Sequence, residues 1–220
     1  MKSFISEDNI EQAICNRLSL PEYGWKRIEC DARVDAQDDV STTGRANPSE
    51  CILPDVLFAA LKRLNPKMDE DVLKIILQDL RKDFTGTDMI DTNYSLYQKI
   101  RNGIQVKVRR NGKDDFDIVR LFDFDHPKMN DFHCVNQMWI KGHYRYRRPD
   151  VLLFVNGLPI VFIELKNSTV KIEEAYNKNL TSYRQDIPNI FAFNQICVLS
   201  NGLQTKIGAW NSKYEFFFEW

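Results

Sequence analysis

Hydrophobic residues recur at helical spacing throughout the first half of the chain. Ile10, Ile14 and Leu18 follow a polar run that contains good helix N-cap residues, so this spacing predicts a first helix. Residues 30–49 are polar and lack such a period, which predicts a loop. Three more amphipathic helices are predicted at 54–64, at 68–80 and near 89–100, with breaks at Asn65-Pro66 and Asn102-Gly103.

Short apolar runs bounded by turn residues predict strands in the second half. Asn156-Gly157 stands between two such runs, and Asn-Gly between apolar runs is the strongest short-range signal for a β-hairpin. A second hairpin is predicted around Asn111-Gly112, and a helix at 173–185 stops before Pro188. The predicted strands cover 104–109, 116–124, part of 135–146, 151–155, 159–163 and 196–199.

Three charged residues stand at the ends of the apolar runs at 151–155 and 159–163: Asp150, Glu164 and Lys166. Ionised side chains beside buried strands are costly unless something compensates them. Two carboxylates and one ammonium at one place indicate a site for a divalent cation, as a metal-dependent phosphodiesterase of the PD-(D/E)xK type requires. The alternative is a solvated strand end that carries a Glu and a Lys on its open face.

The register of this hairpin decides whether the three side chains can meet. Side chains alternate across a strand, so Glu164 and Lys166 share one face. A regular two-residue turn at Asn156-Gly157 would place Asp150 opposite Ile163 and would send Glu164 to the other face. The hypothesis therefore requires a three-residue loop or a bulge in one strand, either of which brings Asp150 opposite Glu164.

Length and composition fit one compact α/β domain. The chain has 220 residues, of which 43% are hydrophobic, enough for a substantial core with a small helical insertion at about 35–103. No apolar segment approaches a membrane span, and residues 1–4 do not begin a signal peptide. The five scattered cysteines lack zinc-ligand spacing, which favours free thiols and a cytoplasmic location.

The formal net charge is −1, so any affinity for nucleic acid must come from local patches. The one basic stretch interleaved with aromatics is 141–148, and it leads directly into Asp150. Arg145, Arg147 and Arg148 are therefore candidate contacts to DNA phosphates near a scissile bond. The alternative is an exposed strand whose charges keep it soluble.

Residues from about 146 to 190 resemble the nuclease domain of the R (restriction) subunit of type I restriction-modification enzymes. The similar text is RRPDVLLFVNGLPIVFIELKN, followed by EEAYNKNLTSYRQDIPNIFAFN and ICVLSNG. That family carries an Asp before the first strand, Glu-x-Lys on the second and Gln-x-x-x-Tyr on the next helix. Asp150, Glu164, Lys166 and Tyr183 match, whereas Asn179 stands where the family has Gln.

The resemblance implies a restriction-endonuclease-like fold of the PD-(D/E)xK superfamily, with a mixed central sheet flanked by helices. It also implies a Mg²⁺-dependent DNA endonuclease in which Asp150, Glu164 and the Leu165 backbone carbonyl bind the metal. Lys166 would orient the attacking water or stabilise the transition state, and Asn179 and Tyr183 would complete the catalytic set. Glu11, in the first helix, is a possible additional metal ligand or a solvated helix residue.

The implied partners are double-stranded DNA and the methyltransferase and specificity subunits of a restriction complex, in which ATP-driven translocation precedes cleavage of unmodified foreign DNA. No G-x-x-x-x-G-K-[ST] loop occurs in the chain, so we expect an N-terminal fragment of a longer protein whose other domains bind ATP. One alternative is a stand-alone structure-specific nuclease of the resolvase or RecB-like class. Another is a non-catalytic module that binds DNA or other subunits.

Overall fold

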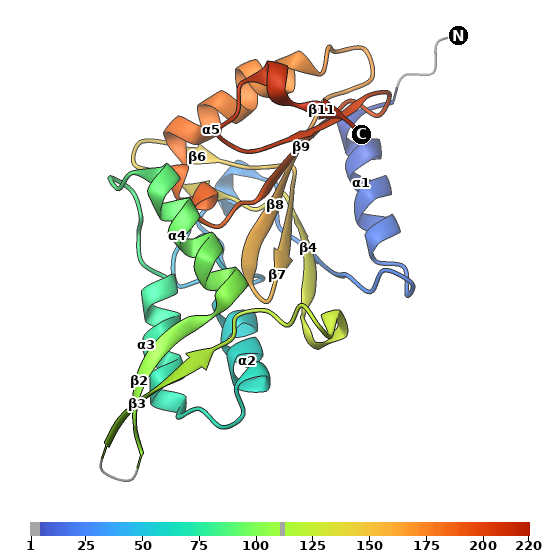
Figure 1. Ribbon diagram of the computed structural model, residues 1–220. Coiled ribbons are helices and arrows are strands. Elements are labelled where there is room, and N and C mark those ends of the chain that lie inside the picture. Colours follow the sequence, from blue (N-terminus) through green and yellow to red (C-terminus); the bar gives the residue numbers. More distant parts are fainter. Residues whose placement is uncertain (1–4, 111–112) are drawn as a thin grey trace.

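The computed structural model describes residues 5–110 and 113–220, and its centre is a mixed β-sheet (Figure 1). Within these residues the sheet has seven strands in the order β1-β4-β7-β8-β9-β10-β11. The β4, β7 and β8 strands are antiparallel neighbours, whereas β1 pairs with β4 and β9 with β8 in parallel. The bounds are β1 (Lys26–Glu29), β4 (Phe132–Asn136), β7 (Val151–Val155), β8 (Leu158–Leu165), β9 (Ile196–Ser200), β10 (Thr205–Gly208) and β11 (Phe218–Glu219).

One face of the sheet is covered by the first helix, α1 (Glu7–Leu18). The Ser6 side chain caps this helix by accepting a hydrogen bond from the Asn9 backbone N–H, as the sequence predicts. Ile10 and Cys15 of α1 are buried against alternate apolar residues of the central strands: Val151, Leu153, Ile163, Leu165 and Val198. This packing directs the polar first turns of α1 along the sheet toward the ends of β7 and β8.

The opposite face is covered by the helix predicted at 173–185. Its middle is a π-helical segment, η3 (Ala175–Leu180), which continues into α5 (Thr181–Asp186) and ends before Pro188. Leu180 and Tyr183 pack against Phe162 and Leu199 from the other side of the same strands. Because residues alternate along β8, Phe162 enters this core while Ile163 enters the one under α1. The sheet is thus buried on both faces at its centre.

The three other predicted helices pack around a separate core (Figure 1). They are α2 (Pro54–Leu64), α3 (Glu70–Leu80) and α4 (Met89–Asn102). The predicted start of the second of them at Met68 is two residues early, because Asp69 caps α3 through its side chain. The chain leaves α4 through Gly103, whose φ of 79° suits a helix C-terminus.

The hairpin that follows consists of β2 (Ile104–Arg110) and β3 (Lys113–Val119). Its second strand begins and ends earlier than the predicted 116–124, because Leu121 turns into the core and Asp123 organises the next loop by accepting backbone hydrogen bonds. The predicted turn at Asn111-Gly112 lies outside the described residues. Figure 1 shows this hairpin projecting away from the central sheet.

The single strand predicted within 135–146 is wrong. The β4 strand ends at Asn136, and the next residues form two short strands, β5 (Ile140–Lys141) and β6 (Tyr146–Arg147), in a sheet of their own. The interruption coincides with Gln137, whose φ is 59°. The short strands β1, β10 and β11 were not predicted, because two to four residues carry too little periodicity.

The polar segment 30–49 is irregular, as predicted, except for the short η1 (Val34–Ala36). Three more 3₁₀ segments are η2 (Pro127–Met129), η4 (Pro188–Ala192) and η5 (Tyr214–Phe216). All five cysteines, each within the described residues, are free, as expected. Among the helices described, none is both long and apolar enough for a membrane span.

Candidate active site

The β7–β8 hairpin carries the bulge that the sequence argument requires. Asn156 and Gly157, with φ of 49° and 82°, form a two-residue turn that pairs Val155 with Leu158. The register then shifts past Ile160, so Val151 pairs with Ile163. One step further along, Asp150 therefore lies beside Glu164, and its Oδ2 accepts a hydrogen bond of 2.7 Å from the Leu165 backbone N–H. The predicted bulge is confirmed.

Glu164 lies at the bottom of the site with 1% of its surface exposed. Its Oε1 accepts a hydrogen bond of 3.2 Å from Lys166, whereas its Oε2 is buried with no hydrogen-bond partner among the described residues. Burial raises the pKa of Glu164 well above its ordinary value, and the Asp150 charge raises it further. Lys166 opposes both effects. A proton, a water molecule or a bound cation can satisfy an unpaired carboxylate oxygen at this depth.

The pKa of Asp150 is raised as well. Burial raises its pKa to about 6, although the hydrogen bond from Leu165 and the charge of Lys166 act in the opposite direction. The carboxylates of Glu11 and Glu7 add to the increase. Two adjacent carboxyl groups with raised pKa values are typical of a site that holds a cation or exchanges protons.

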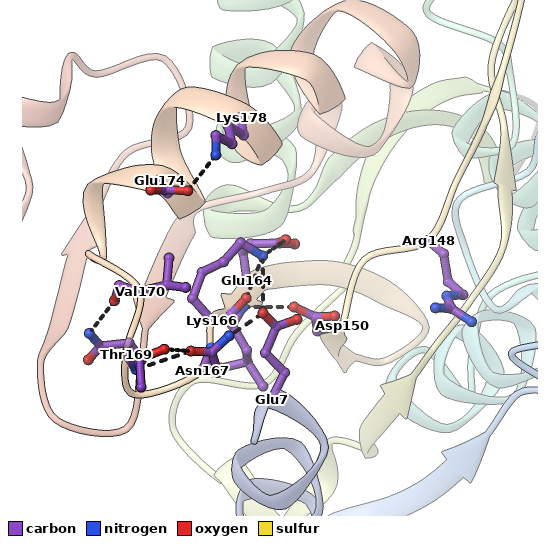
Figure 2. A network of polar contacts seen from close by, with 12 residues as sticks. Glu7, Arg148, Asp150, Glu164, Lys166, Asn167, Thr169, Val170, Glu174 and Lys178 are labelled. Atoms are coloured by element: carbon purple, nitrogen blue, oxygen red, sulfur yellow. Dashed lines mark hydrogen bonds and ion pairs between the residues drawn. The ribbon is translucent and has the colours of Figure 1, made fainter. Parts of the chain in front are cut away.

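Lys166 lies between the two carboxylate-bearing strands and α1. Its ammonium donates hydrogen bonds to the Leu165 carbonyl (2.7 Å) and to Glu164, and its Nζ is 3.9 Å from Oε1 of Glu7 (Figure 2). Glu7 also accepts a hydrogen bond from the Asn167 backbone N–H. Sequence reasoning missed Glu7, because its only signal was a place in the first turn of a helix, where acidic residues are common anyway.

Tyr183 comes to the site from the face of the sheet opposite α1. Its ring is 6% exposed and packs edge-on against Phe162, and its hydroxyl donates to the Arg148 carbonyl at 3.2 Å. Burial raises the pKa of Tyr183 above its ordinary value, and the charges of Glu164 and Asp150 raise it further. A side-chain hydrogen bond with Asn179 opposes this increase. Asn179 and Tyr183 therefore contact each other, and Tyr183 lies next to Glu164. The predicted orientation of both side chains toward Lys166 and their catalytic roles stay predictions.

Glu11 is not a solvated helix residue. Its carboxylate is 4% exposed and accepts hydrogen bonds from the side-chain amides of Asn136, at 2.8 Å, and of Gln137. The Gln137 backbone N–H in turn donates to the Asp150 carbonyl at 3.0 Å. The structure thus connects Glu11 to Asp150 through one residue, and the sequence contained no signal for Gln137.

The three candidate DNA-contacting arginines have different surroundings. The guanidinium of Arg147 is ion-paired with Asp186, with an Nε–Oδ2 distance of 2.6 Å, and lies over the Tyr183 ring. Arg148 donates to the Ala32 carbonyl and lies over the Trp139 ring. Arg145 is exposed. Arg147 therefore serves the fold through these contacts, and the DNA contacts of all three arginines stay predictions.

The residues present fit a hard divalent cation. The unpaired Glu164 oxygen, the adjacent Asp150 carboxylate and the Leu165 carbonyl are oxygen donors of the kind that Mg²⁺ prefers. In the described part of the chain, no three His, Cys, Asp or Glu side chains converge into a complete metal cage. Mg²⁺ usually retains several waters and binds through one or two carboxylates, so two are sufficient.

Comparison with known proteins identifies the family. A sequence profile described as "Type I restriction enzyme R protein N terminus" matches residues 4–216. The chain belongs to this family. The "Type I restriction enzyme HindI endonuclease subunit" of Haemophilus influenzae is 30% identical over 98% of the chain. The "Putative type I restriction enzyme MjaIXP endonuclease subunit" of Methanocaldococcus jannaschii is 33% identical over 98%.

These relatives of the R protein family are much longer than the chain, which spans 20% of the length of each. A shorter match of 35% identity, over 43% of the chain and 10% of the relative, is to the "Type I restriction enzyme SsaAORF53P endonuclease subunit" of Staphylococcus saprophyticus. Family membership therefore applies to nearly the whole chain, and confirms the resemblance stated from its motifs.

Proposed function

We propose that the chain is the endonuclease module of a type I restriction enzyme R subunit and that it hydrolyses DNA phosphodiester bonds with Mg²⁺. The observation that carries this proposal is the pairing of the partly exposed Asp150 with the buried Glu164, two carboxylates with raised pKa values beside one lysine. The endonuclease names of the long relatives support it. The arrangement matches the PD-(D/E)xK pattern, which we assign to the site on these grounds.

The residues have separate tasks in this proposal. Asp150, Glu164 and the Leu165 carbonyl hold Mg²⁺, which when bound lowers the pKa of a coordinated water and neutralises charge on the phosphate. Lys166 turns from the Leu165 carbonyl and Glu164 to a phosphate oxygen or the attacking water. Tyr183, which lies on the same face of the sheet as Glu164, orients that carboxylate, and Asn179 holds the Tyr183 side chain by a hydrogen bond. No base-reading element is needed for this chemistry.

Membership of the family supports the DNA target and the partners proposed here. The substrate is double-stranded, unmodified foreign DNA, delivered by ATP-driven translocation in domains of the longer protein, and methyltransferase and specificity subunits select it. The exposed Arg145 supplies a contact to the DNA backbone, where sequence is not read. We place the complex in the cytoplasm.

The test is Lys166→Gln in the full-length R subunit, assembled with its methyltransferase and specificity subunits. We expect loss of Mg²⁺-dependent plasmid linearisation by at least about a hundredfold, with ATP hydrolysis at the wild-type rate. Gln can still donate to the Leu165 carbonyl, so the local fold is retained. Substantial residual cleavage would remove Lys166 from the catalytic role.

The matched control is Lys178→Gln, which removes a lysine of η3 that forms an exposed ion pair with Glu174 (Figure 2). This pair is far more exposed than Lys166, so cleavage should stay at the wild-type level. Equal losses in both variants would indicate a general effect of charge on DNA binding. Specific double-strand cleavage by the 220-residue chain alone would instead favour a stand-alone nuclease.

A further inference from the structure

Gln137 adopts a backbone conformation that its side chain does not favour. Its φ is 59°, in the left-handed region, where only Gln137 and Asn156 are found among the described residues other than glycine. Asn tolerates this region well and Gly adopts it without cost, but Gln has no such advantage. Strain of this kind is concentrated at functional sites. The turn alone does not require a glutamine.

The left-handed conformation allows Gln137 to contact two parts of the site at once. It follows β4 immediately, so its backbone N–H pairs with the carbonyl of Asp150 at 3.0 Å and extends the β4–β7 ladder by one bond. Its side chain leaves the strand direction and donates from Nε2 to Oε2 of Glu11. Strand and helix are thereby connected through one residue.

The neighbouring Asn136 holds the other oxygen of the same carboxylate. Its Nδ2 donates to Oε1 of Glu11 at 2.8 Å, while its Oδ1 is buried without a hydrogen-bond partner in the described part of the chain. The two consecutive amides hold the Glu11 carboxylate by a hydrogen bond to each oxygen. The charge of Glu11 raises the pKa of Asp150. Both hydrogen bonds to the Glu11 carboxylate come from neutral amides.

We propose that Gln137 is a positioning residue, which uses its left-handed backbone to hold the Glu11 carboxylate beside Asp150 for binding of a divalent cation. The inference rests on the proposed function, because the cation is that of the nuclease. This role explains why a glutamine stands at a left-handed position: a glycine would relieve the backbone strain but would lose the amide that orients Glu11. Groups that orient metal ligands typically contribute ten- to a hundredfold in metal affinity.

The decisive variant is Gln137→Gly, because it separates the side chain from the backbone. Glycine accepts φ of 59° and keeps the N–H that pairs with Asp150, so relief of the backbone should offset the lost hydrogen bond to Glu11 and the metal-free protein should unfold near the wild-type temperature. Mn²⁺, measured by calorimetry and by the electron paramagnetic resonance signal of the free ion, should bind roughly tenfold more weakly. DNA binding in EDTA should not change.

Gln137→Asn is the second variant, in case the glycine chain is too flexible to fold. Asn tolerates the left-handed region and keeps an amide, but its shorter side chain reaches less far, so its Mn²⁺ affinity should lie between those of wild type and Gln137→Gly. Unchanged Mn²⁺ affinity in a folded variant without the Gln137 amide would overturn the inference. A wild-type chain that binds no Mn²⁺ would instead refute the proposed function.

The matched control is Asn156→Gly at the other non-glycine left-handed position. Asn156 is fully buried at the opposite end of β7 and β8 from Asp150, and its amide bonds to Leu121 and Asn130. Its replacement should lower the unfolding temperature, because buried groups lose their partners, and should leave Mn²⁺ affinity unchanged. Gln137→Gly should thus lower Mn²⁺ affinity but not the unfolding temperature, whereas Asn156→Gly should lower the unfolding temperature but not Mn²⁺ affinity. Loss of Mn²⁺ affinity in Asn156→Gly would show that affinity follows stability and would overturn the positioning role.

Discussion

Asp150→Asn should stabilise the metal-free protein at pH 8, although it removes a residue essential to the proposed function. Asp150 has a pKa of about 6, against an ordinary 3.8, because desolvation disfavours its charged form and the charges of Glu11 and Glu7 raise the pKa further. The charged carboxylate is therefore less stable in the folded chain than in the unfolded chain. Asn is neutral, and its Oδ1 can still accept the hydrogen bond from the Leu165 backbone N–H.

The size and sign of the effect follow from linkage. A raised carboxyl pKa gives stability that is fully present below pH 3.8 and is lost as the pH rises to about 6. One pKa unit corresponds to about 1.4 kcal/mol, so at pH 8 the charged Asp150 costs up to about 3 kcal/mol. At pH 4 the cost falls below about 1 kcal/mol, because Asp150 is then protonated in the folded chain.

The assay is urea unfolding in EDTA, followed by tryptophan fluorescence, for wild type and Asp150→Asn at pH 8 and pH 4. We expect the variant to gain about 1 to 3 kcal/mol at pH 8 and much less at pH 4. With Mg²⁺ present the gain should shrink or reverse, because only wild type binds the ion with two carboxylates. A loss of stability at pH 8, or an equal gain at both pH values, would refute the reasoning.

A control with the opposite sign is Asp131→Asn. Burial alone would raise the pKa of Asp131, but the charges of Arg63, at 2.8 Å, and of Lys26 outweigh it, and the pKa lies below its ordinary value. Asp131 therefore stabilises the fold when charged, and its replacement should lower the free energy of unfolding at pH 8. Comparison of Asp150→Asn with Asp131→Asn tests whether the environment of each carboxylate determines the sign of the change in the free energy of unfolding.

Two further predictions concern the cation and the DNA. Because protons compete for Asp150 below a pKa of about 6, millimolar Mg²⁺ should raise the unfolding temperature more at pH 8 than at pH 5, and equal increases would contradict a site at Asp150. Arg145→Ala should weaken DNA binding without loss of stability, and unchanged DNA affinity would contradict its proposed contact. Arg147→Ala should lower the unfolding temperature because it breaks the ion pair with Asp186, and unchanged stability would contradict that role.

The local elements were largely determined by the sequence. Helical periodicity predicted α2, α4 and the helix through η3 and α5, and the cap at Ser6 marked the start of α1, because these signals act within a few residues. Asn156-Gly157 specified the two-residue turn, and the requirement that Asp150 and Glu164 share a face correctly predicted a bulge. The triad of Asp150, Glu164 and Lys166 was identifiable for the same reason: hairpin partners are close in the sequence.

Only the tertiary structure decided the rest of the site. Glu11 and Glu7 reach it because α1 packs across the sheet, more than a hundred residues away in sequence from Asp150. The role of Gln137 depends on a single left-handed residue that divides the strand predicted at 135–146. The ion pair of Arg147 with Asp186 forms only when α5 docks beside β6. Contacts between distant segments, and the charges they bring together, leave no periodic signal in a single sequence.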